Sequence, residues 1–302
     1  MSDPMDRVII IALDGLTYAS WLFLVSAGLS FTFGVVRILN VAHGNLYALG
    51  AYLGAYLVVT HLPAGAAPVV SYLVLLGAAI FVGVTVGPLI ERLFLRRVYG
   101  REEEMQILLT FSILLILEDA IKLVWGVSPI FADKPYVYLG QVRLGGVSYA
   151  RYPFLLTGIA LATGLLLWLL VTRTRFGKIL LSVITDREIS AALGINVPRV
   201  YTLAFSLGTV LAALGGAFSA PMFSVVPGIG AEVIVVSFAV VAIGGLGSIG
   251  GAALGSVLVG LARAAAVHLV PELDLFGIYL IMTLVLLFRP EGLFGRVVLR
   301  RI

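Results

Sequence analysis

The residues of this chain that could do chemistry lie in one charged stretch and in two polar or glycine-rich stretches. The charged stretch, Arg173–Arg199, separates two apolar runs that are each long enough to cross a bilayer. Acidic and basic side chains at this density form ion pairs, cap helices and bind partner surfaces. Because the rest of the chain is almost entirely apolar, this stretch is the best place for a soluble partner to bind.

Within the charged stretch the sequence predicts a short amphipathic helix. Thr185 or Asp186 can cap its N-terminus. Gly194 can end the helix, and Pro198 blocks its continuation. Its apolar face is small and lacks aromatic anchors, so we expect insertion into a groove of a partner protein; the alternative is a helix lying on lipid headgroups. The residues assigned to this site are Asp186, Arg187, Glu188, Ala191, Ala192, Gly194, Ile195 and Asn196.

Two further stretches break the apolar pattern, in the first and last thirds of the chain. Gly34–Asn45 is polar, and Gly244–Gly251 is rich in glycine. Paired interruptions of membrane helices are typical of a transport path, because irregular backbone at membrane depth must be buried in protein or line a wet cavity. The alternative is an ordinary loop beside tightly packed helices, as the spacings Gly50–Gly54 and Gly251–Gly255 allow. The pathway candidates are Asn40, His43, Gly44, Asn45, Gly244, Gly245, Gly247 and Ser248.

Single titratable residues in the apolar runs are interpreted individually. His43 could carry a proton, but a histidine hydrogen-bonded to exposed backbone fits a broken helix better. Glu118 and Lys122 are four residues apart, so we expect an ion pair on one helix face near the membrane interface. Asp14 lies within the first apolar run and has no obvious partner in the sequence.

Several kinds of chemistry are excluded by what the sequence lacks. The chain has no cysteine and 3 histidines, and no zinc-binding spacing occurs. It has no GxxxxGK[ST] motif and cannot hold ATP phosphates in the usual loop. Gly245, Gly247 and Gly250 match GxGxxG, but a membrane-length apolar run follows them, which favours helix packing over dinucleotide binding. We therefore expect no catalytic residue, no metal site and no cofactor bound by this chain.

The elements that position these residues are membrane helices. The chain of 302 residues is 61% hydrophobic and 12% charged, whereas a soluble domain carries about a quarter charged residues. We expect an all-α polytopic bundle of about eight to nine segments, some broken or re-entrant, that forms a single domain over residues 1–302. The predicted segments are Val8–Ser30, Ile38–Thr60, Val69–Ile90, Met105–Trp125, Pro153–Thr172, Val200–Ala220, Ala231–Ile243, Ala252–Val270 and Phe276–Phe288.

Basic residues in the loops predict how the bundle is oriented. These basic residues form three clusters, and an even number of membrane crossings separates each cluster from the next. The positive-inside rule therefore places all three clusters in the cytoplasm. The connections 126–151 and 221–230 and the N-terminus are then external. This clustering favours membrane orientation over nucleic-acid binding, so the expected partners include the lipid bilayer and no nucleic acid. The clusters are Arg92, Arg96, Arg97 and Arg101; Arg173, Arg175, Lys178, Arg187 and Arg199; and Arg289, Arg296, Arg300 and Arg301.

Long stretches in order along the chain match one family of membrane proteins. They are GLTYASWLFLVSAGLSFTFGVVRILNVAHGNLYALGAYL, then TRFGKILLSVITDREISAALGINVPRVYTLAFSLGTVLAALGGAF, and finally VVAIGGLGSIGGAALGSVLVG with LLFRPEGLFG. On these stretches, which cover nearly the whole chain, the sequence resembles the permease subunits of branched-chain amino-acid ABC importers of the LivH type.

The resemblance implies a non-enzymatic subunit of an ATP-driven importer that moves branched-chain, hydrophobic amino acids by alternating access. Such a subunit lies in the inner (plasma) membrane and pairs with a second homologous permease, two cytoplasmic ATPases that bind ATP and Mg²⁺, and an extracytoplasmic substrate-binding protein. By this analogy Asp186–Asn196 carries the coupling helix within the loop 173–199. The broken regions Asn40–Asn45 and Gly244–Gly251 would line the path, where half-helix N-termini could face the substrate carboxylate.

Other functions remain alternatives to this interpretation. An ATP-independent secondary transporter or channel would need carboxylates for coupling ions near the midplane of the membrane, for which only Asp14 is available. A membrane scaffold would leave the broken helices unexplained. Among ABC permeases, urea or a short-chain amide is the closest alternative substrate.

Overall fold

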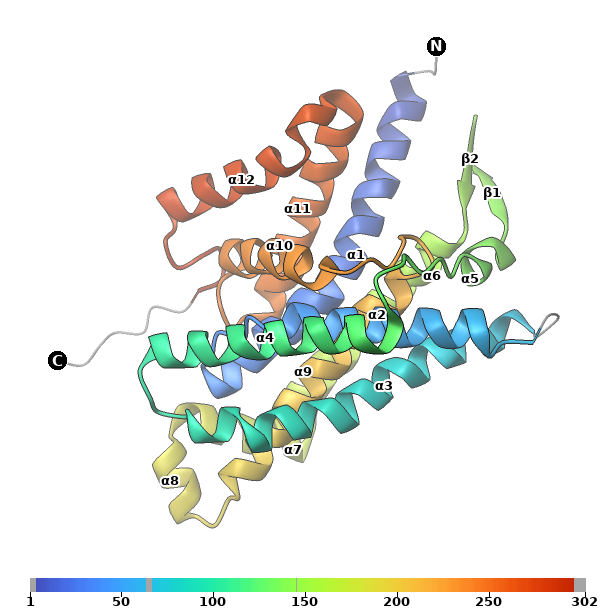
Figure 1. Cartoon of the computed structure of the whole chain (residues 1–302). Helices are drawn as coiled ribbons and strands as arrows, with labels where there is room; N and C mark the ends of the chain where they lie inside the picture. The colour runs from blue at the N-terminus through green and yellow to red at the C-terminus, as the bar shows by residue number, and fades with distance from the viewer. Residues whose placement is uncertain (1–3, 64–66, 145, 296–302) are drawn as a thin grey trace.

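The apolar runs form helices because a backbone surrounded by lipid must satisfy its own hydrogen bonds. The computed structural model describes residues 4–63, 67–144 and 146–295, and each predicted segment overlaps a helix (Figure 1). The long helices are α1 (Pro4–Val36), α2 (His43–Thr60), α3 (Pro68–Leu93), α4 (Glu103–Trp125), α6 (Tyr152–Arg173), α9 (Val197–Ser219), α10 (Ile229–Gly244), α11 (Ile249–Leu269) and α12 (Asp274–Phe288). Shorter elements are η1 (Leu95–Arg97), α5 (Lys134–Tyr138), β1 (Gln141–Leu144), β2 (Val147–Ala150), α7 (Arg175–Thr185), α8 (Arg187–Ala192) and η2 (Pro271–Leu273).

The length and composition of these helices identify a polytopic membrane protein, as the sequence predicts. Two apolar helices, Ile229–Gly244 and Phe276–Phe288, are shorter. Five helices in the described part of the chain are long and apolar enough to cross a membrane: Met5–Val36, Pro68–Arg97, Tyr152–Arg173, Val197–Ser219 and Ile249–Leu269.

The first break is shorter than the sequence suggests. α1 continues to Val36, and α2 begins at His43 instead of Ile38. Arg37 ends α1 in the left-handed region, with a φ of 56°, a conformation that is uncommon for a residue with a side chain. The interruption is therefore confined to residues 37–42.

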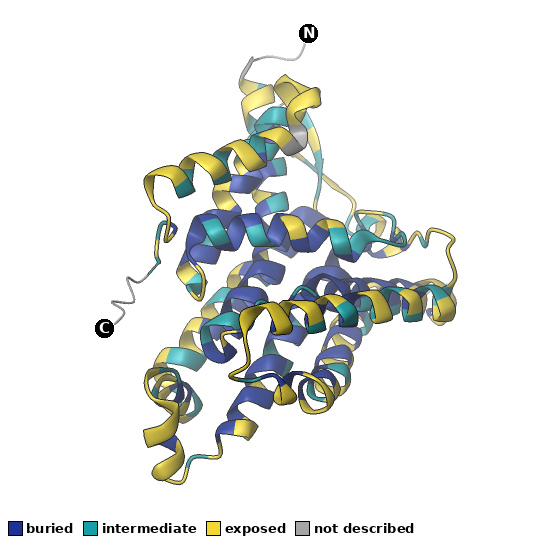
Figure 2. Cartoon of the chain, turned by 60° about the vertical axis from the view of Figure 1, so that its left-hand side comes forward, coloured by how far each residue is buried: buried dark blue, intermediate teal, exposed yellow. Residues whose placement is uncertain are grey.

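Helix α9 is the central helix of the bundle and contacts α1, α2 and α3. Most of its residues are buried, whereas α8 at the lower end is almost entirely exposed (Figure 2). Small residues allow the close packing. A Cβ on Gly50 would collide with the backbone of Ala213, and a Cβ on Gly216 would collide with the Tyr47 carbonyl group. The prediction that small residues bring helix backbones together is confirmed.

The connection 126–151 is more structured than the sequence indicates. It contains α5 and an antiparallel hairpin in which Gln141 pairs with Ala150 and Leu144 with Val147. An isolated bridge between Ile130 and Val225 joins this connection to the one that follows α9. The hairpin and the first turns of α1 lie at one end of the bundle, and α8 lies at the opposite end (Figure 1).

Candidate coupling site

The charged stretch folds into two short helices between α6 and α9, and we call residues 174–196 the elbow. Thr174 caps α7, because its Oγ1 accepts a hydrogen bond from the Gly177 N–H at 3.1 Å. Helix α7 was not predicted from the sequence. The signal was present, since Leu180 and Val183 are buried at helical spacing.

Helix α8 ends where the sequence predicts, and each end has an identifiable cap. Of the alternative N-caps, Asp186 is the one used: its Oδ1 accepts a hydrogen bond from the Ile189 N–H at 2.9 Å. Gly194 follows the helix with a φ of 84°, which favours glycine. Asn196 then caps α9, accepting a hydrogen bond from the Arg199 N–H at 3.1 Å. These local hydrogen bonds define the shape of the elbow.

One hydrogen bond joins the two helices of the elbow to each other, and a cation–π contact and apolar packing attach the elbow to the bundle. The hydroxyl groups of Ser182 on α7 and Ser190 on α8 are 2.9 Å apart and share a hydrogen bond. The Arg187 guanidinium lies 5.9 Å from the centre of the Tyr201 ring on α9. Beneath the elbow, Leu180 and Val183 join an apolar cluster that also contains Ile38 from the first break. The elbow is thus packed against both α9 and the interrupted region after α1.

At α8 and the turn that follows it, the outer face of the elbow consists of small and charged residues around two exposed apolar side chains. Ile189 is 60% exposed and Leu193 is 75% exposed. An apolar tip surrounded by charges is suited to a groove on a partner protein. Of the residues predicted for docking, Ile195 is half-buried and the others are exposed: Asp186, Arg187, Glu188, Ala191, Ala192, Gly194 and Asn196.

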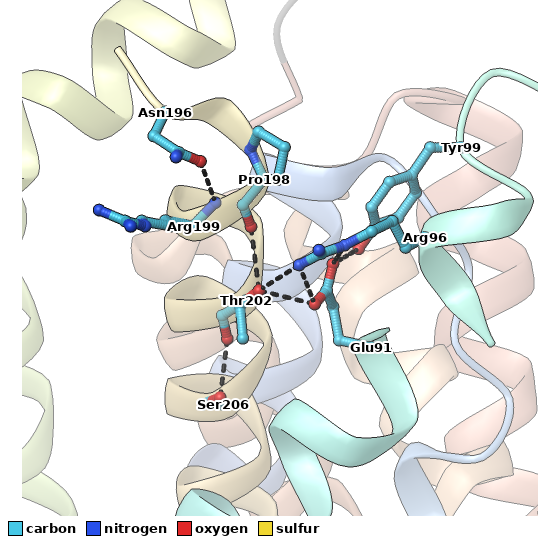
Figure 3. Close-up of polar contacts among 8 residues, drawn as sticks. All are labelled: Glu91, Arg96, Tyr99, Asn196, Pro198, Arg199, Thr202 and Ser206. Carbon is cyan, nitrogen blue, oxygen red and sulfur yellow. Dashed lines mark hydrogen bonds and ion pairs between the residues drawn. The ribbon is translucent and has the colours of Figure 1, made fainter. Parts of the chain in front are cut away.

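A buried carboxylate links the start of α9 to the end of α3 (Figure 3). Glu91 is fully buried, and its Oε2 lies 3.0 Å from the Arg96 guanidinium. The same oxygen accepts a hydrogen bond from Thr202 Oγ1 at 2.6 Å. Tyr99 donates its hydroxyl to Glu91 Oε1 at 3.1 Å, and Arg96 also donates to Thr202 Oγ1 at 2.9 Å. We call Glu91, Arg96, Tyr99 and Thr202 the Glu91 cluster.

The Glu91 cluster gives Arg96 a structural role that the sequence analysis missed. From the sequence, Arg96 was predicted only to be one of several basic loop residues that orient the chain in the membrane. Burial, reinforced by the Glu91 carboxylate, raises the pKa of the Tyr99 hydroxyl, which therefore stays a proton donor. Thr202 lies fewer than two turns of helix beyond the elbow, so the cluster joins the elbow to α3 through α9.

The two predicted breaks meet in the structure. Gly34 at the end of α1 packs against the backbone of Gly247, and a Cβ on Gly34 would lie 3.2 Å from the Gly247 carbonyl oxygen. His43 Nε2 is 3.0 Å from the Val25 carbonyl oxygen, so the histidine does bond to backbone, although this backbone belongs to helix α1 and not to a break. Asn45 donates to the Leu114 carbonyl oxygen at 2.5 Å. Asn40 is buried, and its amide atoms have no hydrogen-bond partner among the described residues.

The second break is closed by the C-terminal segment. The Leu293 N–H donates to the Ile243 carbonyl oxygen at 2.8 Å, and the Phe294 N–H donates to that of Gly244 at 2.9 Å. Gly245 packs against the backbone of this segment, and a Cβ there would lie 2.5 Å from the Gly295 nitrogen. Ser248 begins α11 by accepting a hydrogen bond from the Gly251 N–H at 3.0 Å. That these residues and Gly44 line a path stays a prediction.

The single charged residues are placed as follows. Asp14 does have partners, contrary to the sequence analysis: Tyr149 donates to its Oδ1 at 2.8 Å, and His268 Nε2 lies 2.8 Å from its Oδ2. The Glu118–Lys122 ion pair is confirmed at 2.9 Å. Of the third basic cluster, Arg296, Arg300 and Arg301 lie outside the described residues.

By its fold, the chain is a polytopic helical membrane protein with interrupted helices and an exposed elbow between two long helices. Residues 11–287 match the family described as "Branched-chain amino acid transport system / permease component", and the chain belongs to this family. Its members are permease subunits of ABC transporters and not enzymes.

Individual relatives match along almost the whole chain. The permease protein BraD of the high-affinity branched-chain amino acid transport system of Pseudomonas aeruginosa is 29% identical over 94% of each chain. LivH of Escherichia coli, from a system of the same description, is 27% identical over 94% of each chain. A probable LivH of Methanocaldococcus jannaschii is 27% identical, over 92% of this chain and 90% of that protein.

Proposed function

We propose that the chain is the translocating subunit of an ATP-driven importer of branched-chain amino acids, and that the partner ATPases bind the elbow and move it. The structure of the elbow is the observation that supports this proposal. Helix α8 is capped at Asp186, ends before Gly194 and exposes an apolar tip, and the elbow packs against the bundle through α7 and α9. The family and the BraD and LivH relatives support the substrate class.

The contacts of the elbow suggest how work would enter the bundle. An ATPase holding Ile189 and Leu193 would move α8 together with α9, because Arg187 lies against Tyr201 and Asn196 caps α9. The Glu91 cluster would carry that movement to α3. The apolar cluster beneath α7 would carry the movement to the first break and to the end of α1, where Gly34 packs against Gly247 of the second break.

The proposed importer needs further subunits, because this chain would supply only one half of the membrane passage and no ATPase. The chain would pair with a second homologous permease in the inner membrane, two ATPases would bind ATP and Mg²⁺ below, and an extracytoplasmic binding protein would deliver substrate at the opposite end. Substrate would pass the interrupted helices near Asn40, whose buried amide is available for a polar ligand.

A secondary transporter is the less favoured alternative. Asp14, its only candidate carboxylate in the sequence, belongs to the end of the bundle that carries the hairpin, is 40% exposed and is paired with His268. Glu91, buried near the end of α3, is paired with Arg96 and hydrogen-bonded. Glu91 is thus occupied by its partners, and Asp14 lies at the hairpin end of the bundle, so neither is a carboxylate near the midplane of the membrane that could bind a coupling ion.

The test is co-purification of the chain with its ATPases. Gly194→Trp places a large side chain on the docking face, and Gly100→Trp is the matched control. Both glycines have a positive φ, 84° and 78°, and open space around a Cβ. Backbone strain is therefore similar in the two variants. We expect Gly194→Trp and the charge reversal Glu188→Lys to lose the ATPases, while Gly100→Trp retains them. Retention by both elbow variants would refute the docking assignment.

A further inference from the structure

A cavity lies at the end of the bundle opposite the elbow. Its volume is about 610 Å³, within the usual range for sites that bind small molecules. Its walls come from the first half of α1, the α5–hairpin connection, the segment after α9 and the second half of α11. These segments surround the place where α1 and the hairpin lie side by side in Figure 1. None of the residues predicted from the sequence for the coupling site or the pathway belongs to this lining.

The acidic group of the cavity is held in a defined position. Asp14 lines the cavity and accepts one hydrogen bond from Tyr149 on the hairpin, and it pairs with His268 on α11. Burial raises the pKa of the Tyr149 hydroxyl, with a further rise from the Asp14 carboxylate, so this tyrosine remains a donor. A carboxylate has about four acceptor positions, and these contacts leave room for a further donor. At 40% exposed, the Asp14 side chain is accessible to a ligand.

The basic group of the cavity comes from α11. Arg263 on α11 also lines the cavity, and its guanidinium lies 4.2 Å from the centre of the Tyr18 ring. Asp14 and Tyr18 are one turn apart on α1, and both line the cavity together with Arg263, so an acidic and a basic side chain share its wall. Stacking on an aromatic ring holds a guanidinium in place for a planar carboxylate.

The remaining wall is apolar and aromatic. Ala264 and Val267 extend the α11 side between Arg263 and His268, and Met222 and Phe223 close the side that follows α9. A neutral, fully polar molecule would gain nothing from this wall, whereas an aliphatic side chain would be removed from water against it. An acid, a base and an apolar surface thus face one space.

We propose that this cavity binds an α-amino acid as a zwitterion, with its ammonium group at Asp14, its carboxylate at Arg263 and an aliphatic side chain on the apolar wall. The inference deepens the proposed function and rests on it, because the site would receive substrate before the interrupted helices are reached. It also separates amino acids from urea and short amides, which have no charges for Asp14 or Arg263 to bind.

Ligand analogues test the site on the unaltered protein. The full chain, with the subunits that co-purify with it, is placed in lipid nanodiscs without binding protein and without ATP. L-leucine, 4-methylpentanoate, 3-methylbutylamine and urea are then measured by calorimetry. We expect leucine to bind, and each analogue that lacks one charged group to bind about tenfold more weakly or worse. Equal binding of leucine and either analogue would overturn the proposal, as would the absence of leucine binding.

Substitutions test which side chain binds each charged group of leucine. Asp14→Asn and Arg263→Gln should each weaken leucine binding by about tenfold or more. Asp14→Asn should spare 4-methylpentanoate, and Arg263→Gln should spare 3-methylbutylamine. The matched controls are Asp119→Asn, on an exposed carboxylate of α4, and Arg143→Gln, on an exposed hairpin residue outside the lining. Unchanged leucine binding in both cavity variants would refute the assignment.

The results separate this proposal from the proposed function. A complex that retains its ATPases and imports leucine, yet binds no leucine in the nanodisc experiment, would remove the cavity site alone. A chain that binds leucine through Asp14 and Arg263 but associates with no ATPase would keep the site and remove the ATP-driven mechanism.

Discussion

Substitution of Glu91 tests whether the Glu91 cluster holds the elbow side of the bundle together. Glu91→Gln keeps the shape of the side chain and removes its charge. The amide would bring an NH₂ group toward the donors Arg96 and Tyr99, and the buried site would lose its ion pair. Breaking a buried pair costs about 3–5 kcal/mol. Because Arg96 is 40% exposed and water can partly replace its partner, we expect the lower value of about 2–3 kcal/mol.

The assay is thermal unfolding of the purified protein in nanodiscs. A loss of this size should lower the midpoint by about 5–10 °C, at about 2–4 °C per kcal/mol for a chain of this order of length. Glu118→Gln is the matched control, since it removes a carboxylate from the ion pair with Lys122 at the surface of α4 and should change the midpoint little.

A double-mutant cycle isolates the interaction itself. Arg96→Met leaves the Glu91 carboxylate buried without its cation and should be at least as harmful as Glu91→Gln. The double variant removes both charges, so its loss should be smaller than the sum of the single losses by about 0.5–3 kcal/mol. Equal midpoints for Glu91→Gln and Glu118→Gln, or strictly additive losses in the cycle, would refute the reasoning.

Three further predictions concern the elbow, the core and alkaline pH. Asp186→Ala removes the N-cap of α8, about 1 kcal/mol, and should speed amide hydrogen exchange in α8 about fivefold, as read by mass spectrometry. Gly50→Leu should prevent accumulation of folded protein, because a side chain there meets the Ala213 backbone, whereas Gly77→Leu, with open space around its Cβ, should fold as judged by size-exclusion profile. The raised pKa of Tyr99 means that the unfolded chain ionises first, so stability should fall as pH rises above about 10, and Tyr99→Phe should reduce this loss in unfolding curves.

Features that depend on neighbouring residues could be predicted from the sequence. The cap at Asp186 and the stop at Gly194 are set by side-chain type and backbone preference within a few positions, and both are present. The membrane helices follow from run length and composition in the same way. Helix α7 could have been predicted too, from the helical spacing of Leu180 and Val183.

Features that depend on distant pairs could not be predicted. Thr202 and Glu91 are 111 residues apart, and nothing in a single sequence brings them together. His268 and Asp14 are separated by 254 residues, which is why Asp14 had no visible partner. The contact between Gly34 and Gly247 results from helix packing between distant parts of the chain, and no local sequence pattern indicates it. The cavity has the same origin, since its walls come from four parts of the chain.

The sidedness of the elbow tests the central claim most directly. The chain has no cysteine, so a single introduced thiol can be labelled without background. Ala191→Cys marks the exposed face of α8, and Ser148→Cys marks the hairpin at the opposite end. With a membrane-impermeant maleimide on intact cells, the account predicts labelling of Ser148→Cys alone, and labelling of Ala191→Cys only after the cells are opened. Labelling of Ala191→Cys in intact cells would contradict it, because no cytoplasmic ATPase could then reach the elbow.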